Sequence, residues 1–149
     1  MSSAQNHEPP SDTKKALIHR YLIASGRQAD IDRGKFVERV AVIGQPVFAA
    51  AAEGGATIRE AFDTAFAALR EAYEPHRAVW QEEYESHLNW EYSEEELAQI
   101  VAFLESPAGQ HHLEGSWRMN AYIGTNTEEL VEKIVGEAVD AVKASQLNS

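Results

Sequence analysis

Six histidines and 24 carboxylates are the side chains of this 149-residue chain best suited to metal binding or acid–base chemistry. Glu83 and His87 are four residues apart, so on a helix they would share a face and could bind one ion. A carboxylate-bridged centre needs further ligands from other helices, typically with Glu and His three residues apart, and no Glu-x-x-His sequence occurs here. His111 and His112, with Glu114, form a second group, but adjacent helical residues point about 100° apart. We therefore expect exposed or core-edge histidines and no native metal site.

The sequence patterns of nucleophilic catalysis and phosphate binding are absent. The chain has no cysteine and no Gly-x-Ser-x-Gly elbow, and it contains neither Gly-x-Gly-x-x-Gly nor a phosphate-binding loop. Glu94, Glu95 and Glu96 fall at an expected helix start, where the helix dipole stabilises their charged forms and makes them poor general acids. We assign no catalytic residue and expect no cofactor. An enzyme site assembled from residues distant in sequence remains the alternative.

The segment Ser106-Pro107-Ala108-Gly109 predicts a junction between two helices. Proline disfavours the helical conformation in the residue before it, which ends one helix, and Ser-Pro is also a favourable start for the next. Free N–H groups at a helix start attract anions, and Gly109 would let a ligand or a neighbouring helix approach closely. We favour tight helix packing with Ser106 as the cap; the alternative is an anion- or carboxylate-binding site at Ser106 and Gly109.

Several large aromatic side chains could line an exposed groove, because aromatic residues are enriched in interface hot spots. They are also ordinary core residues, and we expect most of them in the core: Trp80, Trp90, Trp117, Tyr84, Tyr92 and Tyr122. Trp90 is the candidate interface residue, since it stands in a short connection just before the expected cap at Ser93. It either packs across the helix start or belongs to a surface that binds a partner.

Helical periodicity predicts the elements that position these residues. A polar tail over residues 1–10 precedes a first helix, capped by Ser11 or Asp12 and extending to about Ser25. Its expected buried stripe comprises Leu17, Ile18, Tyr21 and Leu22. Asp30 is expected to cap a second helix that continues to Gly54-Gly55 and bends at Pro46. The stripe of this second helix is Phe36, Val40, Ile43 and Val47.

Capping boxes at Thr57–Glu60 and Ser93–Glu96 predict two further helix starts. Their apolar faces are Ile58, Phe62, Ala65, Phe66, Leu69 and Tyr73 in one helix, and Leu97, Ile100, Val101 and Leu104 in the other. Pro75 begins or kinks a helix between them, with Trp80, Tyr84 and Leu88 on one side. Beyond Pro107 a long helical pattern is interrupted near 124–127, and residues 146–149 fray. The prediction is an all-α, single-domain bundle of five to seven helices over residues 11–145, with a helix–Ser-Pro–helix elbow near residue 106.

The composition restricts the classes of partner. A formal net charge of −11 argues against nucleic acid and anionic membranes and allows basic partners. The absence of cysteine excludes disulfides and sulfur-based zinc sites. No apolar run approaches the roughly 20 residues of a membrane-spanning helix. The amino terminus has no apolar signal segment, so a literal reading is cytoplasmic; the alternative is a mature form whose leader was replaced by methionine.

The segment from Tyr92 to Gln110 resembles the signature of the bacterial proteins grouped as domain of unknown function 2059. The matching residues are the capped start Tyr92-Ser93-Glu94-Glu95-Glu96-Leu97, the aromatic Phe103, and Ser106-Pro107-Ala108-Gly109-Gln110. The resemblance implies a small all-helical domain, usually exported by Gram-negative bacteria, with no established activity or catalytic residues. Leu104 replaces a second aromatic that commonly follows Phe103, and the leader usual in that family is missing.

These observations favour a non-catalytic helical module that binds a protein or small ligand in the bacterial envelope. A basic partner and a homodimer formed through a long helix face are both compatible with the sequence, whereas nucleic acid and membrane insertion are not expected. The alternative is an enzyme or metal-dependent protein. A deep pocket joining His87 or His112 to buried carboxylates would favour that alternative, and a filled core with an exposed aromatic patch would favour the binding module.

Overall fold

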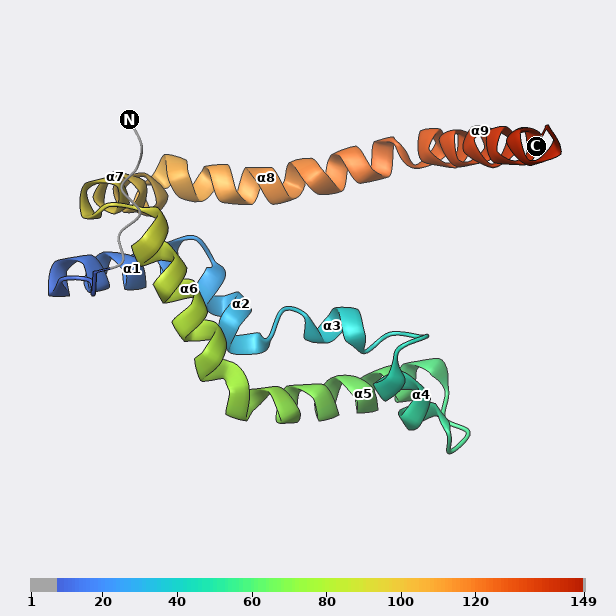
Figure 1. Cartoon of the computed structure of the whole chain (residues 1–149), viewed down its shortest axis with the longest axis horizontal. Coiled ribbons are helices and arrows are strands. Elements are labelled where there is room, and N and C mark those ends of the chain that lie inside the picture. Colours follow the sequence, from blue (N-terminus) through green and yellow to red (C-terminus); the bar gives the residue numbers. More distant parts are fainter. Residues whose placement is uncertain (1–7, 149) are drawn as a thin grey trace. The chain divides into compact units, whose positions relative to one another are not determined.

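A computed structural model describes residues 8–148, and nearly all of them are helical (Figure 1). No strand occurs within this range, so the all-α prediction is confirmed. The elements in chain order are α1 (Asp12–Ala24), α2 (Arg27–Arg33), α3 (Val37–Val40), α4 (Pro46–Ala52), α5 (Ile58–Tyr73), the 3-10 turn η1 (Glu74–His76), α6 (Arg77–Glu91), α7 (Glu94–Glu105), α8 (Pro107–Asn126) and α9 (Glu128–Leu147). Most of the predicted tail over residues 1–10 lies outside the described residues.

Residue contacts divide the chain into two compact units, one ending at Ser106 and the other beginning at Pro107. The sequence predicted one helical domain across this position. The predicted end of one helix and start of another at Ser106-Pro107 is confirmed, since α7 ends at Glu105 and α8 begins at Pro107. The dipeptide therefore separates the units as well as the helices.

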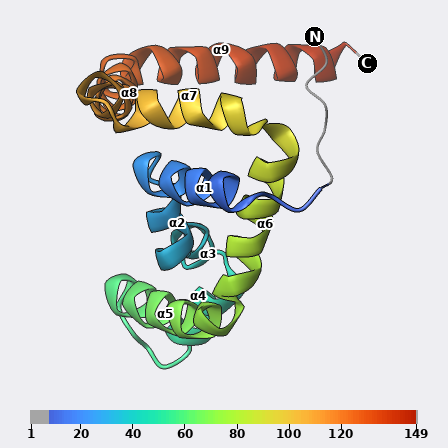
Figure 2. The same ribbon diagram turned by 90° about the vertical axis from the view of Figure 1, so that its left-hand side faces the viewer.

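The core of the first unit forms where α1 packs on α7 and also contacts α2 and α6; Figure 2 shows α1 alongside α7. Six of its buried side chains follow the predicted stripes of α1, α6 and α7: Leu17, Ile18, Leu22, Leu88, Leu97 and Val101. The seventh, Ile31 on α2, was not predicted. The start of α7 is fixed by the predicted capping box. The Glu96 amide donates to Ser93 Oγ over 3.1 Å, and the Ser93 amide donates to Glu96 Oε1 over 3.0 Å. Two otherwise unpaired N–H groups are thereby satisfied within the chain.

The single long helix predicted from Asp30 to Gly54 is wrong. Asp30 lies inside α2 rather than at its cap, and α2 ends at Gly34, which has φ +69° and donates its N–H to the Asp30 carbonyl over 3.0 Å. Gly44 adopts φ +91°, and Pro46 begins α4 instead of bending a longer helix. Glycine tolerates this left-handed conformation, and proline at the first helical position loses no hydrogen bond. The chain therefore makes three short helices, which raises the helix count above the predicted five to seven.

The buried side of this segment also differs from the predicted stripe. The buried residues are Ile31, Val37, Ala41 and Phe48, whereas Ile43 is 63% exposed. The turns at Gly34 and Gly44 reset the helical phase, so a continuous 3.6-residue period no longer describes which side chains face inward.

The helices α5 and α6 meet at the predicted break. Glu74–His76 form η1 around Pro75, and α6 follows it directly. The Tyr73 hydroxyl donates to the buried Ile31 carbonyl over 2.5 Å and so ties the end of α5 to α2. On α5, Ala65 and Tyr73 are buried as predicted, whereas Ala61 is buried without having been predicted and Ile58 is 67% exposed.

The second unit consists of α8 and α9, and the predicted interruption is confirmed at Thr127. The Thr127 amide and hydroxyl both donate to the Ile123 carbonyl, over 3.0 and 2.6 Å. Comparison of Figures 1 and 2 shows that α9 leaves α8 in a different direction, so neither helix covers the length of the other. Gly109 is the buried residue of α8, and no residue of α9 is buried.

Candidate functional site

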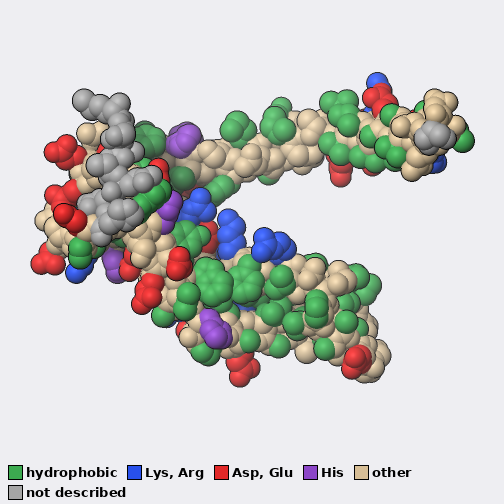
Figure 3. All heavy atoms as spheres, viewed as in Figure 1, with side chains coloured by type: hydrophobic (Ala, Val, Ile, Leu, Met, Phe, Trp, Pro, Cys, Tyr) green, Lys and Arg blue, Asp and Glu red, His purple; other side chains and the backbone are tan. Residues whose placement is uncertain are grey.

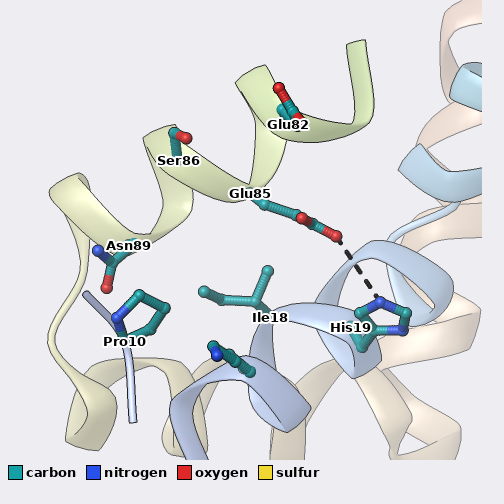
Figure 4. Close-up of a pocket in the computed structure, with 8 residues that line it drawn as sticks. Pro10, Ile18, His19, Glu82, Glu85, Ser86 and Asn89 are labelled. Carbon is teal, nitrogen blue, oxygen red and sulfur yellow. Dashed lines mark ion pairs between the residues drawn. The ribbon is translucent and has the colours of Figure 1, made fainter. Parts of the chain in front are cut away.

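A hollow of about 420 Å³ lies between α1 and α6 in the first unit (Figure 4). Its residues are Pro10, Lys15, Ile18, His19, Glu82, Glu85, Ser86 and Asn89. Figure 4 shows Glu85 reaching from α6 towards His19 on α1, with Ile18 below Glu85 and beside His19. The hollow therefore combines an apolar base with polar side chains from two helices, as small-ligand sites do.

His19 and Glu85 form the acid–base pair of this hollow. His19 Nε2 lies 3.7 Å from Glu85 Oε1, and the two side chains are 67% and 36% exposed. Water screens a pair this exposed, and such pairs contribute at most about 1 kcal/mol to stability. Ser86 supplies a hydroxyl to the lining, and Figure 4 shows it away from the imidazole. The arrangement suits weak binding of a small polar group better than catalysis.

Asn89, which lines this hollow, and Lys14, which is hydrogen-bonded to it, were not singled out from the sequence. The Lys14 side chain is only 3% exposed, and Nζ donates to the Asn89 carbonyl over 2.9 Å, close to the end of α6. A lysine at this place satisfies a terminal carbonyl and complements the helix dipole. The Asn89 Oδ1 atom is buried without a hydrogen-bond partner among the described residues. Spacing was the sequence signal that could have indicated its burial, because Lys14 precedes Leu17 and Ile18 by three and four residues and so shares their face of the helix.

The two residues predicted for an anion site fall in different units. The Ser106 hydroxyl donates to the Phe103 carbonyl over 2.6 Å and so closes the end of α7. Gly109 is buried in the first turn of α8. An anion or carboxylate site at Ser106 and Gly109 stays a prediction.

Trp90 lies in the last turn of α6, and not in a connection between helices as the sequence suggested. It is half-buried, and its ring centroid is 6.0 Å from that of His87. Within residues 8–148 no three histidine or carboxylate side chains are placed to hold a metal ion. The contact that the structure shows for the His87 ring is thus the one with Trp90. The role of Trp90 in an interface stays a prediction.

The shifted pKa values belong to packing contacts. Burial raises the pKa of Tyr21 and of Tyr73. The hydrogen bonds from the Arg20 guanidinium lower the pKa of Glu105, and the same contact raises the pKa of Arg20. None of these four residues, Arg20, Tyr21, Tyr73 and Glu105, lines the α1–α6 hollow.

The expectation that most of the large aromatic side chains lie in the core is wrong, because Trp80, Trp117 and Tyr122 are exposed and none of the six is fully buried. Part of an aromatic surface is assembled around Trp80. Phe36 stacks on Trp80 with ring centroids 5.5 Å apart, and Tyr73 meets Trp80 edge-on at 5.3 Å. Trp80 shares a hollow of about 380 Å³ with Tyr84, together with Asp30, Ile31, Lys35, Phe36 and Arg39. This surface joins stacked rings with two basic side chains. The remaining tryptophans and tyrosines lie elsewhere.

The largest apolar exposure occurs on α8 and α9, and Figure 3 shows hydrophobic side chains along both helices. On α8 these are Trp117, Met119, Tyr122 and Ile123, each more than half exposed. On α9 they are Leu130, Val131, Ile134, Val135, Val139 and Val142, with exposed fractions between 44% and 57%. At 3.6 residues per turn the apolar α9 residues cover one half of the helix, and the charged side chains other than Glu128 occupy the other half. This amphipathic face of α9 has no covering element within the second unit.

Comparison with known proteins does not identify the chain. No family model matches it, and neither a curated protein nor a solved structure shows significant similarity. The resemblance of residues 92–110 to domain of unknown function 2059 stays a prediction. No helix of residues 8–148 is both long and apolar enough to cross a bilayer.

Proposed function

We propose that this protein is a non-catalytic helical module that binds protein through its second unit. The observation that carries the proposal is the amphipathic face of α9, which nothing in the second unit covers; Trp117 and Tyr122 are also exposed on α8. A helix of about 20 residues that packs on nothing is marginal in water, because helix stability in proteins comes mainly from burying an apolar face. We therefore expect α9 to be stabilised by a binding partner that covers its apolar face.

The alternative function is a small-ligand or catalytic protein centred on the α1–α6 hollow. His19 and Glu85 are the groups that would do chemistry there, but their pair is exposed and lacks a neighbouring nucleophile. The exposed aromatic side chains of α8 instead favour the binding module. An envelope location follows from the resemblance at residues 92–110, and cell fractionation of the protein expressed from its native gene tests it.

Site-specific photocrosslinking in the native host tests the binding function. A photoreactive amino acid at Val131, on the apolar face, should give a covalent protein adduct of defined mass. The matched control carries the same amino acid at Asp140, on the charged side of α9. An adduct at Val131 and none at Asp140 supports the proposal. Absence of any adduct from Val131, and also from Trp117 on α8, would contradict it.

A further inference from the structure

We propose that the hollow beside Trp80 in the first unit binds a small aromatic carboxylate, with its ring on Trp80 and its carboxylate at Arg39. The site is separate from the α9 face and does not depend on the binding function proposed for that face. Its lining comes from α2, α3, α6 and the turn between α2 and α3: Asp30, Ile31, Lys35, Phe36, Arg39, Trp80 and Tyr84.

The aromatic wall of this hollow is ordered before any ligand binds. The rings of Phe36 and Trp80 are stacked at an interplanar angle of 12°, and Tyr73 meets both of them edge-on. Tyr73 is itself held by the hydrogen bond from its hydroxyl to the Ile31 carbonyl. Trp80 nevertheless keeps 39% of its surface exposed. A pre-ordered indole with an exposed surface costs a stacking ligand little conformational entropy.

Arg39 supplies a cationic group that the fold does not use. It lines the hollow from α3, is exposed, and forms no ion pair with any carboxylate of residues 8–148. A guanidinium presents a planar fork of N–H donors, which matches a carboxylate through two parallel hydrogen bonds. Arg39 is therefore placed to bind an anion at the rim of an aromatic hollow.

The charge beside the hollow is positive although the chain as a whole is acidic. Asp30 is the carboxylate of the lining, and its Oδ1 lies 2.9 Å from Arg33 Nη2. Its Oδ2 lies 3.7 Å from Lys35 Nζ and 3.8 Å from Arg27 Nη1, so one carboxylate faces three cations. Charges beyond a Debye length of about 8 Å are largely screened at physiological ionic strength. The nearby cations therefore outweigh the net charge of −11 at this place.

The two parts of the lining together define the ligand class. A neutral aromatic compound would leave Arg39 without a partner, and an aliphatic anion would leave the exposed surface of Trp80 uncovered. The volume of about 380 Å³ is near the lower end of the range for ligand pockets, about 300–1,000 Å³, which favours a small ligand. An aromatic carboxylate satisfies all three conditions.

Nuclear magnetic resonance titration of the full ¹⁵N-labelled chain measures both the affinity and the place of binding. The probe is 2-naphthoate, with neutral 2-naphthamide and ringless acetate as matched compounds. Saturating 2-naphthoate should shift the indole N–H signal of Trp80, whereas those of Trp90 and Trp117, which do not line the hollow, should not move. Naphthamide and acetate should each bind about tenfold more weakly, because each lacks one of the two contacts.

Three charge-removing variants test the role of the cations. Arg39→Gln should weaken 2-naphthoate binding about tenfold, because the charged partner of the carboxylate is lost. Lys35→Gln should have a smaller effect, since its ammonium group is already shared with Asp30. Arg118→Gln is the matched control: it removes the same charge from an exposed position on α8 and should leave binding unchanged. The unfolding midpoint of Arg39→Gln should equal that of wild type, because Arg39 forms no ion pair in the fold.

Three results would overturn the inference. Equal affinity for 2-naphthoate and 2-naphthamide would show that the carboxylate is not recognised. Signal shifts confined to Trp90 or Trp117 would place the probe outside the hollow. Binding that Arg39→Gln leaves unchanged, or that Arg118→Gln weakens equally, would exclude Arg39 as the group that holds the anion.

Discussion

Individual residues explain where the helices of the first unit stop. Gly34 is the clearest case, because it combines a left-handed backbone with close packing. A Cβ atom there would lie 3.0 Å from Tyr73 Cδ1 and 3.1 Å from Val37 Cγ2. Gly26 has a similar φ of +81°, but an added Cβ meets nothing within 4 Å. The two glycines therefore separate backbone strain from steric crowding.

Replacing each glycine by alanine in a separate variant should destabilise the protein by different amounts. Gly26→Ala should cost about 1 kcal/mol from the left-handed backbone alone. Gly34→Ala should cost about 2 kcal/mol or more, because the Tyr73 ring must also move. Urea denaturation measures both free energies of unfolding. Equal losses would show that Tyr73 and Val37 adjust freely and would contradict the packing described for this turn.

Residue chemistry also shows why part of the candidate site was not predicted. The His19–Glu85 pair joins residues 66 positions apart, and nothing in their local spacing relates them. Lys14 was not singled out, because lysine is almost never fully buried unless it is paired. Its partner is a backbone carbonyl, which the sequence does not mark. Ser106 and Gly109 were visible as a helix junction, but their binding role depends on contacts that a local pattern does not specify.

At the scale of elements, the pairing of α1 with α7 is the contact that organises the first unit. Arg20 on α1 donates from both Nε and Nη2 to the Glu105 carboxylate at the end of α7. This contact lowers the pKa of Glu105. A carboxyl group whose pKa is lower in the folded state stabilises the fold above its unfolded pKa, and this contribution is lost as the pH falls through the folded value.

Glu105→Gln should therefore lower stability at neutral pH and have less effect in acid. The difference from wild type should shrink as the pH falls below about 4.5, the ordinary value for Glu105. The effect should be small, because exposed ion pairs contribute little. Urea denaturation at several pH values measures it, with Glu71→Gln on the exposed side of α5 as control. A difference that persists unchanged in acid would exclude the Arg20–Glu105 contact as its cause.

Elements defined by local hydrogen bonds could be predicted from sequence, and those defined by glycine conformation could not. The capping box at Ser93 and Glu96 located the start of α7, because both bonds form within three residues. The apolar spacing of residues 36–47 is compatible with one continuous helix when the sequence is considered alone. Gly34 and Gly44 instead adopt positive φ, a choice that depends on how the short helices pack.

At the scale of the whole molecule, the two units differ in how their apolar residues are used. The stripe of α7 is buried in the first unit, whereas the apolar row of α9 is exposed. Both rows have the same helical period, so periodicity predicted the helices but did not distinguish an internal core from an external interface. The division at Ser106-Pro107 was likewise visible only as a helix boundary.

Hydrogen exchange in α9 of the isolated chain tests the central claim most directly. If α9 is completed by a partner, its amides should exchange with little protection when that partner is absent, because helix stability in proteins comes mainly from burying an apolar face. Protection in α1 and α7 should be strong, because their contacts lie within one chain. Strong protection of α9 in the isolated chain would show that the chain covers this face by itself and would contradict the account.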